Sequence, residues 1–128
     1  MSQRTFMLVC AYLGPLALFP FFAARNDADA QWHARQGLVM TLAELVALGA
    51  LSVFVGAMVL THLGVGMALF GGLWLLWVAV VGLHLAAMVA ALNGGRFRVP
   101  GASALAESDW ARAVSSLARG VVARVRPR

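Results

Sequence analysis

The sequence contains no lysine, a single cysteine and only five acidic residues, which stand against ten arginines. With Cys10 alone, an intrachain disulfide framework is excluded. Charged residues make up 12% of the chain and hydrophobic residues 62%, a composition that excludes an ordinary soluble domain. Too little polar sequence remains for a nucleic-acid recognition fold, despite the net charge of +5. The composition predicts a small all-α polytopic membrane protein.

Three apolar runs account for most of the chain. They cover residues 6–24, 38–63 and 65–92. About 20 helical residues cross a hydrocarbon core of about 30 Å, so each run is long enough to span a bilayer. We therefore predict three transmembrane helices within a membrane domain over residues 1–100, followed by a cationic tail over residues 101–128.

The first run has two unusual features. Pro15 and Pro20 should kink or end its helix, because each removes a backbone donor and clashes with the preceding turn. Met1–Arg4 is short and positive, so cleavage of this run as a secretory signal peptide is the alternative to a span. Its length and its aromatic residues favour the span.

A charged island, Arg25–Gly37, separates the first two runs. Asn26, Asp27 and Asp29 are residue types that begin helices, which predicts an interfacial helix leading into the second span, with Trp32 at headgroup depth. The arginines of the island and of the chain after the third run outnumber Arg4 at the start. By the positive-inside rule the island and the C-terminus are cytoplasmic and the N-terminus lies outside, in a bacterial inner membrane.

The tail after about Ser103 has apolar and basic residues on opposite faces of a helix. This pattern predicts a cationic amphipathic helix lying on anionic lipid, with a disordered basic tail as the alternative. The residues expected at the membrane surface are Trp110, Arg112, Arg119, Arg124 and Arg126.

Two ionisable residues lie inside the predicted spans. Glu44 and His84 both fall in the cytoplasmic half and can meet, either as a structural polar clamp or along a polar path for transport. The three histidines lie at depths too different for one metal or haem site, so we predict no metal and no cofactor. Without an activated nucleophile, a phosphate loop or paired carboxylates, we also predict that the protein is not an enzyme.

Two cytoplasmic motifs resemble a known family. Trp32-His33-Ala34-Arg35-Gln36 opens the second span, and Gly95-Arg96-Phe97-Arg98-Val99-Pro100 follows the third. Together with Gly14-Pro15-Leu16 they resemble bacterial small membrane proteins related to the twenty-kilodalton channel subunit of the chloroplast inner-envelope import machinery, the Tic20-like family. The resemblance implies a helical membrane fold and, by analogy, a part in transport. Without it, the residues predict that His33 and Gln36 hydrogen-bond to the turn at Gly94–Pro100 or bind a ligand.

These observations predict a non-enzymatic accessory or assembly subunit of a larger membrane complex. We expect it to assemble with other membrane subunits in preference to copies of itself. We also expect the tail to bind anionic lipid. Two alternatives remain: a homo-oligomeric translocation or permeation channel, and a membrane-surface sensor that acts through the basic tail.

Overall fold

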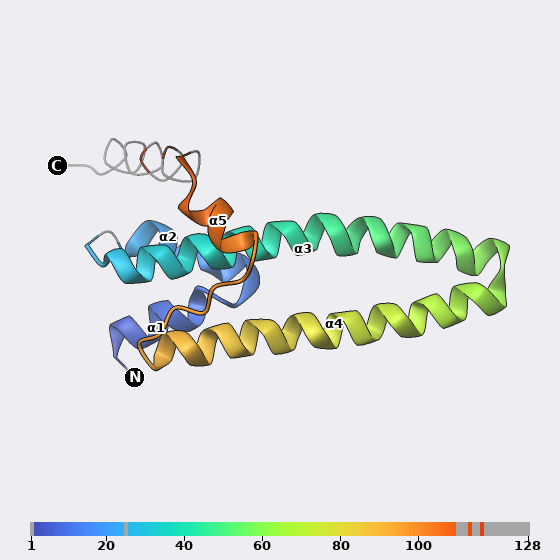
Figure 1. Ribbon diagram of the computed structural model, residues 1–128, viewed down its shortest axis with the longest axis horizontal. Helices are drawn as coiled ribbons and strands as arrows, with labels where there is room; N and C mark the ends of the chain where they lie inside the picture. Colours follow the sequence, from blue (N-terminus) through green and yellow to red (C-terminus); the bar gives the residue numbers. More distant parts are fainter. Residues whose placement is uncertain (1, 25, 110–112, 114–115, 117–128) are drawn as a thin grey trace.

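The structure, a computed structural model, describes residues 2–24, 26–109, 113 and 116, and over these residues it is helical without strands. The elements are the helices α1 (Gln3–Cys10), α2 (Leu18–Ala23), α3 (Ala28–Thr61), α4 (Leu63–Leu92) and α5 (Ala102–Glu107), with the 3-10 helix η1 (Gly14–Ala17) between α1 and α2. The long pair α3 and α4 forms a hairpin (Figure 1). The short elements gather around its open end, which we call the base.

The hairpin consists of the only two helices in the described residues that are long and apolar enough to cross a membrane. Asp27 begins α3, because its carboxylate accepts hydrogen bonds from the backbone amides of Asp29 and Ala30. The apolar part of α3 starts at Leu38. His62 joins the two helices in a tight turn. These helices match the second and third predicted runs.

The first apolar run does not form one helix, so the predicted third span is not confirmed. Gly14 has a φ of +59°, which only glycine adopts readily, and Pro15 directly follows it. The chain reverses there, and the run divides into α1, η1 and α2, which pack at the base of the hairpin (Figure 1).

The main hydrophobic core joins this divided run to the hairpin. Met7, Leu8 and Ala11 pack against Ala87 and Ala91 of α4. Gly37 permits the closest backbone approach, since a Cβ there would lie 1.7 Å from the carbonyl oxygen of Ala11. The core therefore lies at the base, whereas the far half of the hairpin has only a small cluster of its own.

The segment after α4 returns to α3. α5 packs against α3 and ends at Glu107, where Ser108 adopts an extended conformation. The predicted amphipathic helix from Ser103 is thus interrupted within the described residues, and its first turns belong to the base. The surface residues predicted farther on, Trp110, Arg112, Arg119, Arg124 and Arg126, lie outside the described residues.

Candidate functional site

A cluster of ionic side chains at the base centres on Asp29. Arg4 donates to its Oδ2 at 3.0 Å, and Arg96 donates to its Oδ1 at 3.1 Å. Arg4 also lies 3.5 Å from the carboxylate of Asp27. One carboxylate near the start of α3 thus joins the beginning of the chain to the segment after α4.

His33 lies one helical turn after Asp29 and is completely buried. Its Nδ1 is 2.7 Å from the hydroxyl of Tyr12, and its Nε2 is 3.8 Å from Oδ2 of Asp29. Burial raises the pKa of the Tyr12 phenol, which keeps the hydroxyl protonated and able to donate to Nδ1. A neutral His33 then carries its proton on Nε2, which has no hydrogen-bond partner.

The environment favours a neutral histidine beside an ionised aspartate. Burial lowers the pKa of His33 and outweighs the opposing attraction of Asp29. Burial by itself raises the pKa of Asp29, but hydrogen bonds from Arg96 and Arg4 and the nearby positive charges lower it overall. We call Arg4, Tyr12, Asp29, His33 and Arg96 the base cluster.

The segment 93–107, which we call the C-terminal strap, is held on α3 by side chains of the predicted motif. Trp32 donates from Nε1 to Glu107 at 3.0 Å, and Gln36 donates to the carbonyl of Phe97 at 2.6 Å. Arg96 lies over the Trp32 ring at 5.1 Å. The Trp32 side chain is buried within the protein, and its expected depth at the headgroups stays a prediction. The strap and α3 thus form one polar unit.

The other motif residues have less central positions. Arg35 donates to the carbonyl of Gln31 within its own helix. Arg98 lies 3.8 Å from Glu107, and Pro100 is exposed in the turn before α5. Of the two side chains predicted to hydrogen-bond to the Gly94–Pro100 turn, Gln36 donates to the carbonyl of Phe97, whereas His33 contacts Tyr12.

Glu44 and His84 lie together in the hairpin. Nδ1 of His84 is 3.4 Å from Oε1 of Glu44 and 3.1 Å from the carbonyl of Val80. Both side chains are mostly buried. This arrangement can link α3 to α4 by a polar contact within apolar surroundings.

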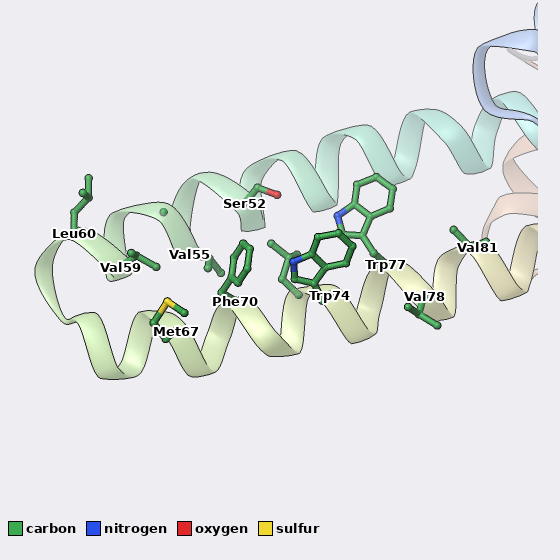
Figure 2. Close-up of a pocket in the computed structure, with 12 residues that line it drawn as sticks. Ser52, Val55, Val59, Leu60, Met67, Phe70, Trp74, Trp77, Val78 and Val81 are labelled. Atoms are coloured by element: carbon green, nitrogen blue, oxygen red, sulfur yellow. The ribbon is translucent and has the colours of Figure 1, made fainter.

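Farther along the hairpin, an apolar groove of about 1090 Å³ lies between α3 and α4. Trp74 and Trp77 of α4 lie on one side, and Ser52, Val55 and Val59 of α3 lie across from them (Figure 2). The two tryptophans therefore line the space between the helices and remain substantially exposed.

Across residues 2–24 and 26–109 with 113 and 116, no group of three or more His, Cys, Asp or Glu side chains is placed to hold a metal ion. Arg4, Tyr12 and Asp29 were not predicted as site residues. Arg4 is 25 residues from Asp29 along the chain, and Tyr12 is 21 residues from His33. At such separations no local sequence pattern indicates the contacts.

Comparisons with known proteins correct the sequence-based resemblance. Neither the curated proteins nor the solved structures contain a match to this chain. The profile of the magnetosome magnetite crystal formation family, MamF/MmsF, matches residues 2–106. The assignment to the Tic20-like family is therefore wrong, because the three short motifs on which it rested all lie within the range that matches the MamF/MmsF family. The chain belongs to the MamF/MmsF family of magnetosome magnetite crystal formation proteins.

Proposed function

We propose that the protein is a non-enzymatic accessory component of magnetite crystal formation, anchored in the magnetosome membrane by the α3–α4 hairpin. The family match over residues 2–106 carries this proposal, because it spans both the hairpin and the base. The exposed apolar surface of the hairpin supports the membrane anchor, since helices of this length in a soluble core would be largely covered.

The acidic side chains favour an accessory role over direct binding of iron or mineral. Hard metal ions prefer carboxylate oxygens, and the sequence has only five carboxylate side chains. Asp27 and Asp29 pair with arginine, Glu44 lies beside His84, and Glu107 accepts from Trp32. Asp109 also has an interaction within the protein. Each of the five carboxylates therefore already has an interaction within the protein.

The base supplies a defined platform for such a role. The base cluster joins the start of the chain to α3, and the strap contacts of Trp32 and Gln36 fix the segment after α4 on the same helix. We expect this platform to contact other membrane subunits. The apolar groove between α3 and α4 offers these subunits a further contact surface within the membrane.

The proposal is tested by removing the gene from a magnetite-forming bacterium and measuring crystal size and shape by electron microscopy. We expect an altered crystal population that the intact chain restores. The variant Trp32→Phe, which keeps the stacked ring but cannot donate to Glu107, should restore it less well. Unchanged crystals in the deletion strain would refute the proposal.

The partner class is tested on the same strain by extraction in a mild detergent and determination of native mass. Other magnetosome proteins recovered at a constant ratio support the accessory role. A homo-oligomer alone, with flux that the variant Glu44→Gln abolishes, would instead favour the channel alternative.

A further inference from the structure

The divided first run exposes a patch of large apolar side chains that the fold leaves uncovered. Phe6 of α1 and Phe19 of α2 meet edge to face with ring centroids 5.7 Å apart, although they are 46% and 50% exposed. This ring contact joins the exposed apolar surfaces of α1 and α2. Leu13, Leu16, Leu18 and Phe22 of the same run are also exposed, and we call these four side chains together with Phe6 and Phe19 the patch.

The two ends of this run lie side by side. Arg4 precedes the run and Asp29 follows it, yet their side chains are 3.0 Å apart, and Arg4 is also 3.5 Å from Asp27. A helix that crossed the bilayer would separate its ends by about 30 Å. The run therefore enters and leaves the apolar region on one side.

We infer that residues 5–24 form a re-entrant segment whose exposed patch inserts into a single leaflet of the bilayer. The segment packs on the last turns of α4 through Met7 and Ala11. The last turns of α4 also expose Val89 and Leu92, so both α4 and the first run have exposed apolar side chains at the base.

The charges around the segment fit a lipid surface better than a protein partner. Arg4 and Arg96 border the base with about half of each side chain exposed, although both pair with Asp29. Arginine at this position can also bind phosphate headgroups while apolar side chains enter the acyl region. The segment thus has the chemistry of an interfacial insertion, with an apolar body and a cationic border.

The inference changes the predicted topology. Arg96 also binds Asp29, so the N-terminal end, the island and the strap all lie on one side of the membrane. By the positive-inside rule this side is cytoplasmic, and among the described residues only the hairpin turn at His62, which has no formal charge, faces the opposite side. The outside N-terminus expected from three spans is replaced by a cytoplasmic one.

The first experiment determines on which side of the membrane each end of the segment lies. It uses single cysteines introduced into the full chain carrying Cys10→Ala. The variants Gln3→Cys and Asn26→Cys bracket the segment at exposed positions, and Gly64→Cys marks the hairpin turn, where a side chain meets no other atoms. On spheroplasts, a membrane-impermeant maleimide should label Gly64→Cys, whereas the two bracketing sites should react only after permeabilisation. Labelling of Gln3→Cys together with Gly64→Cys would overturn the inference.

The second experiment identifies what covers the patch. A nitroxide at Phe19→Cys is compared with one at Val53→Cys, on the exposed apolar surface of α3, and one at Asn26→Cys, outside the apolar runs. In vesicles of phosphatidylcholine and phosphatidylglycerol, the Phe19 label should match Val53, with greater access to oxygen than to a water-soluble nickel complex. Access like that of Asn26, or low access to both reagents as in a contact with protein, would overturn lipid as the occupant.

Discussion

The substitution Gly37→Ala tests the close packing that joins the first run to α3. The added Cβ would lie 1.7 Å from the carbonyl oxygen of Ala11 and 2.9 Å from its carbon. Real Cβ contacts are essentially never shorter than 3.0 Å, so the two backbones must separate by about 1.3 Å, the difference between 3.0 and 1.7 Å. No side-chain rotation can relieve this contact, because the obstructing atoms are backbone.

The magnitude follows from two opposing effects. Overpacking of this kind costs up to about 3 kcal/mol. The better helix propensity of alanine offsets about 1 kcal/mol of it. The net loss of about 2 kcal/mol should lower the Tm by about 8 °C for a chain of this size.

The assay is thermal unfolding of the purified full chain in a mild detergent, followed by circular dichroism. The matched control is Gly49→Ala on the same helix, where an added Cβ meets nothing within 4 Å. This control should leave the Tm unchanged or raise it. Equal Tm values for Gly37→Ala and Gly49→Ala would refute the packing argument.

Three further predictions use the same assay. The free energy of unfolding should fall as the pH drops from about 6.5, because the fold lowers the pKa of His33 and the unfolded chain therefore binds a proton first. His33→Gln should flatten this pH dependence, and an unchanged slope would contradict the buried neutral histidine. Tyr12→Phe should destabilise the fold by about 1–3 kcal/mol, because it leaves Nδ1 of His33 buried without its partner, and a neutral effect would show that the contact is dispensable. Gly66→Ala should open the hairpin turn, because its Cβ would lie 2.4 Å from Val59 backbone atoms, whereas Gly64→Ala should not; similar Tm values would contradict the tight turn.

The hairpin was predictable because its information is local. The apolar runs over residues 38–63 and 65–92 predicted the end of α3 and both ends of α4 within about two residues, and the small residues around Gly64 indicated the turn. The start of α3 at Ala28 lies ten residues before its run, in the charged island. The first run has the same length and composition as a span, yet it folds back at Gly14 and Pro15. Composition and length do not show whether such a break kinks a span or reverses the chain. The reversal brings Met7, Leu8 and Ala11 into the core at the base, and these contacts are distant in sequence.

The candidate site was predictable only in part, for the same reason. His33 and Gln36 could be predicted as site residues because they are polar and lie at the start of an apolar run. Their partners Tyr12 and Phe97 could not be predicted, because tertiary packing determines these contacts. The contact of Glu44 with His84 could be anticipated from depth along two adjacent helices, because a hairpin aligns such positions. Its role remains a prediction.

The central claim is that the protein supports magnetite crystal formation through its assembled base. The most direct measurement is the crystal size distribution, by electron microscopy, in a deletion strain complemented with the intact chain, Gly37→Ala or Gly49→Ala at equal expression. The account predicts that the intact chain and Gly49→Ala restore the crystals and that Gly37→Ala restores them less well. Normal crystals without the gene, or equal rescue by both variants, would contradict it.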